Sequence, residues 1–377
     1  MSLLQDHKRV VVKIGSNVIA SHGKGLHETR MEAISAEIAS AILNAKQRSE
    51  FLLVSSGAIL CGIEKLGWSH KAKTLPIKQA AASVGQSHLI WTYERLFSQH
   101  QINVAQILLT KEDIANRKRF LNARNTLMTL LAHKVLPIIN ENDTVTTKEI
   151  QFGDNDALAG QVALLVDASL LIILSDVDGL FTGDPRVDKT AQLIPVVDAV
   201  TAKIEKVAGN RGQAGGTGGM ASKVATAKSV ALFGVTTVII NGTTPGALTR
   251  LFQGKPTGTI FLPHANKRSS KRHWIADGLK TKGTLTLDAG ATEAILKKGK
   301  SLLPAGVTSV EGIFREGDAV ACQSPTGAII AKGLTHYNAS DIVKIRGAQS
   351  SQIEAILGYK LADEVIHRDN LVLCNAS

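Results

Sequence analysis

The sequence predicts a protein of two domains, in which a three-layer αβα sandwich with a mainly parallel sheet precedes a small, mostly β module. Three observations support this prediction. The chain has 377 residues, more than one compact core normally accommodates. Between residues 9 and 261, short β-branched runs alternate with segments of helical periodicity. Such alternation predicts a mainly parallel sheet with right-handed crossovers, whereas the last hundred residues carry short alternating segments instead.

The first domain contains apolar runs that are typical of buried strands. They lack alternation of polar and apolar residues, as expected when helices cover both faces of a sheet. The intervening segments carry apolar residues at helical spacing. We therefore predict strands at 10–12, 51–54, 104–109, 135–139, 170–174 and 237–240, with helices at 29–47, 77–96, 120–133, 156–166 and 220–232.

A short basic segment marks a change of pattern near residue 267. We predict a first domain at 1–265, a linker at 266–278 and a second domain at 279–377. Turns that contain glycine separate the short segments of the second domain, which is typical of a small β module. From Asp277 onward there are 11 basic and 11 acidic residues, so the whole net charge of +11 belongs to the preceding part. The predicted strands of the second domain are 284–287, 307–314, 319–323 and 328–334.

The composition excludes several classes of protein. Hydrophobic residues make up 44% of the chain and charged residues 20%, which excludes wholesale disorder. The three cysteines are too few and too widely spaced for a disulfide framework or a metal cluster. No uncharged apolar stretch approaches the roughly 20 residues that cross a bilayer. These features predict a cytoplasmic protein, and its positive charge indicates anionic partners.

Polar segments follow the predicted strands, where open α/β sheets bind their ligands. The first strand leads into Lys13 and Gly15, which can direct an ammonium and backbone N–H groups at a phosphate. A lysine that merely reaches solvent is the commoner explanation for one such residue. The second strand ends at Ser55 and Ser56, which open a helix. That position suits a carboxylate or phosphate, and an ordinary helix cap explains it equally well.

Two polar clusters flank the connection after the strand at 135–139. Residues 140–143 follow that strand, and residues 153–156 open the next helix. Each cluster alone has a structural explanation, because Asp and Asn favour turns and caps. Together the two clusters favour a site that binds an amino group and a carboxylate. The following strand ends in Ser175 and Asp176, which indicates a loop lining a nucleotide or its metal, with a plain turn as the alternative.

A glycine-rich stretch, residues 212–223, has five glycines in its first eight positions. Residues 216–221 formally match the dinucleotide-binding pattern. Polar residues rather than a strand precede them, however, and the next strand ends at Asn241 where that pattern needs an acid. We therefore predict a phosphate-binding loop that leads into a helix carrying Lys223, because a purely structural linker seldom needs so many glycines.

In this order, five of these segments resemble the amino acid kinase family, and within it the members that phosphorylate glutamate; they are 12–16, 55–59, 140–143, 153–156 and 216–223. The second domain resembles a PUA domain. The resemblance implies ATP-dependent phosphorylation of the side-chain carboxylate of L-glutamate to L-glutamyl 5-phosphate, the first step of proline biosynthesis, with Mg²⁺ as cofactor. A carboxylate acceptor is already ionised at neutral pH, which agrees with the absence of histidine from these segments.

The resemblance also implies a role for individual residues. Lys13 and Lys223 would contact the ATP phosphates, and Asp156 would hold the two ammonium groups in place. The residues expected to bind glutamate are Ser56, Asp143 and Asn155, assisted by Asn140 and Asp154. No side chain is assigned to a metal. The residues expected to bind ATP, besides the two lysines, are Ser175, Asp176, Thr217, Gly218, Gly219, Met220, Ala221 and Ser222.

Alternative functions stay open at this stage. RNA binding or modification would suit a PUA-like module, but the balanced charge of that module disfavours it because phosphate contacts dominate affinity for RNA. Kinases of N-acetylglutamate, aspartate or uridylate share the fold. An acceptor without a free ammonium would leave Asp143 uncompensated, which disfavours acetylated glutamate. The resemblance further implies a homo-oligomer, either dimer or tetramer, and feedback inhibition by proline.

Overall fold

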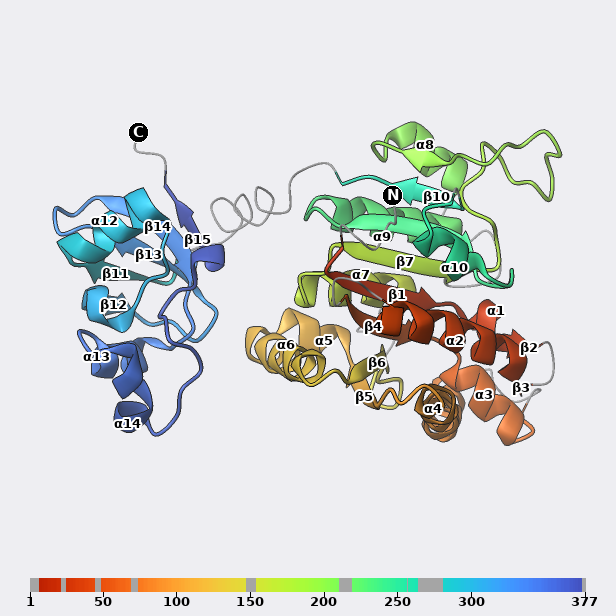
Figure 1. The fold of residues 1–377 in the computed structure, drawn as a ribbon, viewed down its shortest axis with the longest axis horizontal. Helices are drawn as coiled ribbons and strands as arrows, with labels where there is room; N and C mark the ends of the chain where they lie inside the picture. The colour runs from red at the N-terminus through yellow and green to blue at the C-terminus, as the bar shows by residue number, and fades with distance from the viewer. Residues whose placement is uncertain are drawn as a thin grey trace. The chain divides into compact units, whose positions relative to one another are not determined.

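The computed structural model divides the chain into two compact units, Met1–Ala265 and Asn266–Ser377, and each is described by itself (Figure 1). The residues described are 7–21, 25–44, 49–68, 74–146, 154–209, 219–255, 257–263 and 281–374. The predicted linker at 266–278 and most of the predicted glycine-rich loop lie outside these residues.

The first unit contains an eight-stranded sheet in the order β5-β6-β4-β1-β7-β9-β10-β8. Every neighbouring pair is parallel except β9 and β10, which confirms the prediction of a mainly parallel sheet. The strands are β1 (Arg9–Ile14), β4 (Glu50–Ser55), β5 (Val104–Leu109), β6 (Leu136–Glu141), β7 (Leu170–Ser175), β8 (Val196–Val197), β9 (Thr236–Asn241) and β10 (Thr259–Phe261).

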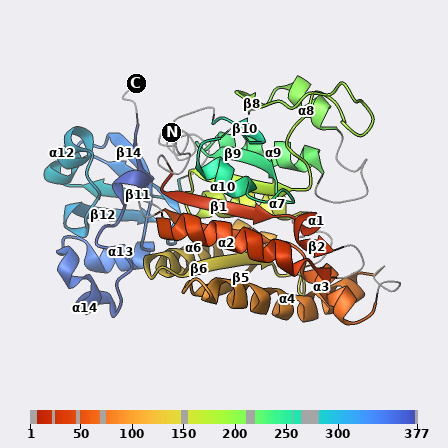
Figure 2. The ribbon, with the colours of Figure 1, turned by 45° about the vertical axis from the view of Figure 1, so that its right-hand side comes forward.

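Helices cover both faces of this sheet and enclose two hydrophobic cores. On one face lie α2 (Glu28–Asn44), α4 (Leu75–Ser98) and α10 (Ala247–Phe252), with α2 and α4 side by side in Figure 2. On the other face lie α6 (Arg117–Ala132), α7 (Asn155–Leu165) and α9 (Met220–Ala231). The remaining described elements are α1 (Ser16–Ile19), β2 (Ala20–Ser21), β3 (Gly25–Leu26), α3 (Ala58–Lys65), α5 (Lys111–Ala115) and α8 (Ala202–Ala208).

The alternation of side chains along each strand decides which layer a residue meets. In β1, Val10, Val12 and Ile14 belong to the core beside α2 and α4, whereas Val11 belongs to the core beside α7 and α9. Because successive side chains of a strand point to opposite faces, Lys13 shares the face of Val11. By the same rule Asn140 shares the face of Ile138, toward α4. The site described below depends on this assignment.

The second unit is a five-stranded sheet in the order β12-β11-β13-β14-β15, with its own hydrophobic core. Each of the four predicted strands overlaps one of these strands. The prediction missed β15 and three helices, which have at most ten residues and leave little periodic pattern. The elements are β11 (Gly283–Leu287), α12 (Ala289–Lys298), β12 (Val307–Gly312), β13 (Ala319–Gln323), β14 (Ile329–Leu334), α13 (Ala339–Ile345), α14 (Ile353–Leu357) and β15 (Leu371–Leu373).

Candidate active site

The candidate site lies at the central strands β1 and β7, where the order of the strands reverses. From β1 the sheet continues through β4, β6 and β5 on one side, and from β7 it continues through β9, β10 and β8 on the other. The carboxyl ends of parallel strands that flank such a point form a crevice in which α/β proteins bind ligands. Most of the residues predicted from sequence follow the ends of β1, β4, β6 and β7 or begin α7 and α9.

Lys13 and Lys223 converge on Asp156. The Lys13 Nζ atom lies 2.6 Å from Asp156 Oδ1, and the Lys223 Nζ atom lies 3.1 Å from Asp156 Oδ2. The exposed fractions are 4% for Lys13, 5% for Lys223 and 0% for Asp156. The structure therefore brings together two cations that are 210 positions apart in the chain (13 and 223), with one carboxylate between them.

Close packing of two helices explains how Lys223 reaches Asp156. Asp156 and Gly160 are four residues apart on α7 and therefore share a face of the helix. A Cβ atom at Gly160 would lie only 2.9 Å from the Thr226 side chain of α9, so glycine permits the approach. Thr226 is three residues after Lys223 and lies on the same face of α9. Lys13 arrives from β1 because its side chain points to the face that α7 covers.

The cluster presents two cations to one buried carboxylate. Lys13 and Lys223 both contact Asp156 in surroundings that water barely reaches, and the charge of Lys223 also acts on Asp176. Buried ammonium groups are stabilised by anions close to them. Next to Lys13, Gly15 has no side chain, and a Cβ atom there would lie 3.5 Å from Lys13 Nζ. No side chain at position 15 therefore covers the backbone beside the Lys13 ammonium. These residues fit a polyanion such as a triphosphate.

Ser175, Asp176 and Asn17 lie at the carboxyl ends of β1 and β7. Asp176 accepts hydrogen bonds from Asn17 Nδ2 at 2.9 Å and from the Ser175 hydroxyl at 3.3 Å. Burial by itself would raise the pKa of Asp176, but these hydrogen bonds and the charge of Lys223 keep it below its ordinary value. The loop expected to bind nucleotide is therefore coupled electrostatically to the lysine cluster. Thr217 and Gly218 lie outside the described residues, and Gly219 caps α9.

A hydrogen-bonded chain of amides connects the residues expected to bind glutamate. Asn155 Nδ2 donates to Asn140 Oδ1 at 2.9 Å and to Ser56 Oγ at 3.0 Å. Asn140 Nδ2 donates to Gln86 Oε1 of α4 at 2.8 Å. The chain thus joins α7, β6, α4 and the turn after β4. Asp154 belongs to a different set of contacts, because it caps α7 by accepting from the Ala157 backbone and also accepts from the Ser222 hydroxyl.

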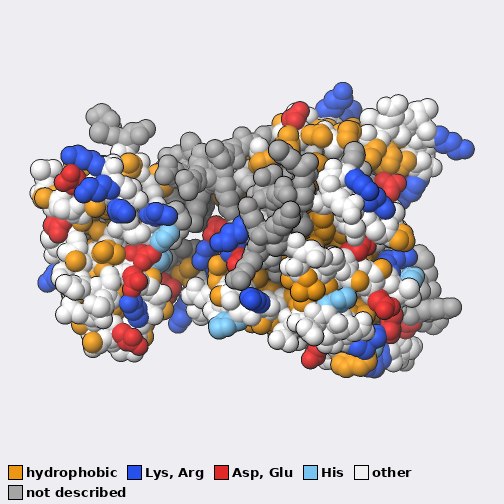
Figure 3. Space-filling view, in the orientation of Figure 1, with side chains coloured by type: hydrophobic (Ala, Val, Ile, Leu, Met, Phe, Trp, Pro, Cys, Tyr) orange, Lys and Arg blue, Asp and Glu red, His pale blue; other side chains and the backbone are white. Residues whose placement is uncertain are grey.

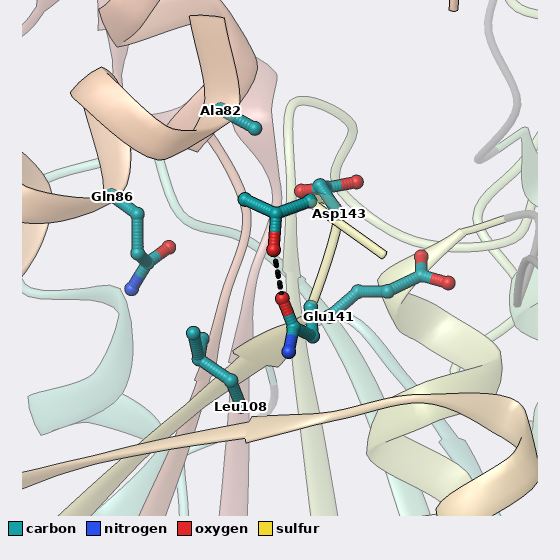
Figure 4. A pocket seen from close by; sticks show the side chains of 7 residues that line it. Ala82, Gln86, Leu108, Glu141 and Asp143 are labelled. Carbon is teal, nitrogen blue, oxygen red and sulfur yellow. Dashed lines mark hydrogen bonds between the residues drawn. The ribbon is translucent and has the colours of Figure 1, made fainter. Parts of the chain in front are cut away.

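Asp143 lines a small recess beside these amides. Figure 4 shows Gln86 entering from α4 and Asp143 projecting from the turn that follows β6; the recess is lined by Ala82, Gln86, Leu108, Glu141, Asn142, Asp143 and Thr144. Burial raises the pKa of Asp143 from 3.8 to about 6. A desolvated carboxylate of this kind gains free energy when a cation binds beside it. The geometry therefore suits an ammonium ligand.

Sequence analysis missed several residues that shape the site. Asn17 follows β1 and orients Asp176, while Tyr93 of α4 shares a 2.9 Å hydrogen bond with Ser55 at the end of β4. Gln86 was also missed. It replaces an apolar residue in the buried stripe of α4, and a buried amide at such a position needs hydrogen-bond partners. That polar interruption was the signal that could have identified it.

Metal ligands are scarce in the part of the chain that the structure describes. It contains no group of three or more His, Cys, Asp or Glu side chains that could hold a metal ion. Within the same residues, no helix combines the length and the apolar character that crossing a membrane requires. A site with few carboxylates would suit Mg²⁺ where phosphate oxygens supply most of its ligands, since Mg²⁺ commonly needs only one or two protein carboxylates.

Comparison with known proteins identifies the class of protein. The model of the amino acid kinase family matches residues 8–241, more than half of the chain, and the model of the PUA domain matches residues 283–357. The chain therefore belongs to the amino acid kinase family, as the resemblance of its motifs predicts.

Within this family, the chain is similar over nearly its whole length to bacterial proteins named glutamate 5-kinase. The protein from Citrifermentans bemidjiense is 48% identical over 98% of this chain and 99% of its own length. The protein from Geobacter sulfurreducens is 46% identical over the same shares. Among solved structures, the UMP kinase from Bacillus anthracis is 18% identical, covers 69% of this chain and 97% of its own, and has a TM-score of 0.46.

Proposed function

We propose that the protein transfers the γ-phosphoryl group of ATP to the side-chain carboxylate of L-glutamate, the first step of proline biosynthesis. The observation that carries the proposal is the meeting of Lys13 and Lys223 at Asp156, whose neighbour Asn155 is linked through Asn140 to Gln86 in the recess that contains Asp143. One part of the site suits a triphosphate, and the adjoining part suits an amino acid. The full-length similarity to glutamate 5-kinases supports this assignment.

At the phosphate end, Lys13 and Lys223 neutralise negative charge. In the reaction a carboxylate oxygen of glutamate forms a bond to the γ-phosphorus, and the bond from that phosphorus to the bridging oxygen of ADP breaks. Transfer of this kind depends on alignment and on stabilising charge over the phosphoryl oxygens. An ammonium has three donors, so its bond to Asp156 does not exhaust it. We propose that Asp156 fixes the direction of both ammonium groups.

At the acceptor end, Asp143 binds the α-ammonium of glutamate, and Ser56 and Asn155 orient the substrate. Asn140 supports Asn155 through the 2.9 Å hydrogen bond described above. The glutamate carboxylate needs no general base because its ordinary pKa is about 4.3. Asp154 contributes indirectly, since it fixes the first turn of α7, which also carries Asn155 and Asp156.

Mg²⁺ bound to the phosphates supplies further neutralisation of charge at the transferring group. Among the described residues near the lysine cluster, Asp176 would suit such an ion as a ligand, because Asn17, Ser175 and Lys223 keep its pKa below the ordinary value despite burial. An ionised carboxylate is the kind of oxygen ligand that Mg²⁺ prefers. Residues 219–222 begin α9 beside this site and complete the proposed nucleotide-binding segment.

The test is to trap the acyl phosphate product with hydroxylamine. The purified protein is incubated with ATP and Mg²⁺ and with L-glutamate, N-acetyl-L-glutamate or L-aspartate in separate reactions. We expect hydroxamate with glutamate well above the level with the acetylated amino acid, because only a free ammonium compensates Asp143. Equal rates with glutamate and N-acetylglutamate would contradict the proposed role of Asp143.

Two further properties belong to the same proposal. Proline shares an α-amino and α-carboxylate group with glutamate, and we propose that it inhibits by occupying the same recess; titration of initial rates with proline tests this. We also propose a cytoplasmic homo-oligomer, dimer or tetramer, which sedimentation at several protein concentrations would detect.

RNA binding is a weaker candidate for the second unit. Figure 3 shows basic and acidic side chains together on one face of that unit, and residues 277–377 carry 11 basic and 11 acidic residues. A surface that binds RNA normally carries an excess of positive charge. A shift of bulk RNA or tRNA in a gel, abolished by salt, would restore this alternative.

A further inference from the structure

Helix α4 holds both ends of the turn that carries Asp143. Gln79 Nε2 donates to the Thr146 carbonyl oxygen at 3.0 Å, and Gln86 Oε1 accepts from Asn140 Nδ2 at 2.8 Å. The two glutamines are seven residues apart, about two turns of helix, so they project from one face of α4. Asp143 lies between the two attachment points. α4 is therefore part of the wall of the amino acid recess.

Backbone groups determine how the Gln86 amide is oriented. The Glu141 backbone N–H can only donate, and it donates to Asn140 Oδ1 at 2.8 Å. The amide nitrogen of Asn140 must then point to Gln86, which presents its oxygen in return. The Gln86 Nε2 group takes no part in this hydrogen bond. Within the described residues it has no hydrogen-bond partner, although Gln86 is only 9% exposed and lines the recess with Asp143.

The same reasoning applies to Ser56 on the other side of the amide chain. Asn155 Nδ2 donates to the Ser55 carbonyl oxygen at 3.0 Å. A carbonyl oxygen can only accept, so the atom of the Asn155 amide that faces Ser55 must be the nitrogen. Ser56 Oγ accepts from that nitrogen, and within the described residues its own hydrogen has no acceptor. The recess itself is lined by the donor of Gln86 and the acceptor of Asp143, and Asn155 and Asn140 connect Ser56 to Gln86. A zwitterionic amino acid has the complementary arrangement of charges.

We propose that Gln86 determines specificity by donating Nε2–H to the α-carboxylate of the amino acid whose ammonium Asp143 binds. The α-carboxylate and α-ammonium are attached to the same carbon, so a ligand held by Asp143 carries its carboxylate within the same recess. The inference rests on the proposed function and adds a residue to it. It predicts that Gln86 favours an α-carboxylate over an α-amide, because a hydrogen bond from Nε2–H to an ionised carboxylate is stronger than one to the neutral carbonyl oxygen of an amide.

The experiment compares L-glutamate with L-glutamic acid α-amide as acceptors, for the wild type and for Gln86→Glu and Gln86→Met. In Gln86→Glu the oxygen that accepts from Asn140 is retained, while the donor is replaced by an oxygen that repels a carboxylate. Gln86→Met removes the donor without adding charge. At pH 8, we expect the ratio of kcat/KM for glutamate to that for the α-amide to fall by about 3- to 10-fold in Gln86→Met, the difference between a hydrogen bond to a charged group and one to a neutral group, and further in Gln86→Glu.

The control is Ser87→Glu, which adds the same charge to the solvent-exposed side of α4. Its ratio should equal that of the wild type. Equal losses with both acceptors in the Gln86 variants, leaving the ratio within twofold of the wild type, would overturn the inference and assign Gln86 a structural role only. Isothermal titration of both acceptors yields the same ratio where turnover is too slow. A wild type that forms no hydroxamate from glutamate would instead overturn the proposed function.

Discussion

The raised pKa of Asp143 makes glutamate affinity depend on pH. Burial raises this pKa from 3.8 to about 6, and only the ionised carboxylate attracts an ammonium. Below pH 6 the fraction of ionised Asp143 falls about tenfold for each pH unit. We therefore expect the KM for glutamate to be about tenfold higher at pH 5 than at pH 7.5, with little further change above pH 7.

The same shift has a consequence for the stability of the free protein. The folded-state pKa lies above the unfolded value, so the folded protein binds the proton more tightly. The proton bound by Asp143 makes its whole contribution to the free energy of unfolding below about pH 3.8, and this contribution is lost as the pH rises through 6. A shift of about two units corresponds to about 3 kcal/mol at neutral pH. Glutamate binding offsets this cost, so its stabilising effect on thermal unfolding should grow between pH 5 and pH 7.

The assay measures initial rates between pH 5 and pH 8 with saturating ATP and Mg²⁺, varying glutamate at each pH. Asp143→Asn is the matched variant, because it keeps the size of the side chain and removes its titration. We expect its KM to be about 10- to 100-fold above that of the wild type at pH 7.5, with a nearly flat profile. A wild-type KM that changes less than twofold between pH 5 and pH 7.5 would refute the reasoning.

Other changes test the lysine cluster and the packing around it. Lys13→Ala or Lys223→Ala should lower kcat by about 10²- to 10³-fold while circular dichroism stays native, because Asp156 keeps one cation; near-normal turnover in either variant contradicts its role. Asp156→Asn removes the carboxylate that both ammonium groups contact and should cost about 3–5 kcal/mol in urea unfolding, part of which ATP restores; wild-type stability without ATP would argue against the cluster. Gly85→Ala places a Cβ atom 1.8 Å from the Ala58 carbonyl oxygen and should cost about 1–3 kcal/mol, which thermal unfolding would detect as a lower Tm.

Most of the first unit's fold was predictable because its strands and helices are long and uniform in character. The six predicted strands all occur, and β6 continues two residues beyond its predicted end, to Glu141. β8 and β10 have only two and three residues, too few to show a pattern. They form by pairing with strands that are distant in the chain, and this pairing produces no pattern in the local sequence.

Sequence motifs indicated the types of residue in the site better than their connections. Lys13 and Asp143 follow strand ends, where chemistry is expected. Asp154 was grouped with the substrate-binding residues, and its observed contacts are those of a helix cap. Gln86 follows no strand and belongs to no motif. It enters the site because the turn after β6 packs on α4, which is a property of the folded chain.

The amino-acid order by itself determined the layers of the first domain, the ends of its strands and the chemical types of the site's residues. These follow from local periodicity and from the conformational preferences of glycine, Asp and Asn, which act over a few residues. Only the tertiary structure decided that Lys13 and Lys223 meet at Asp156, and that Gln86 and Asp143 line one recess. Those distances depend on the twist of the sheet and on the close packing of α7 with α9 and of α4 with β6, where side chains far apart in the chain must fit one another.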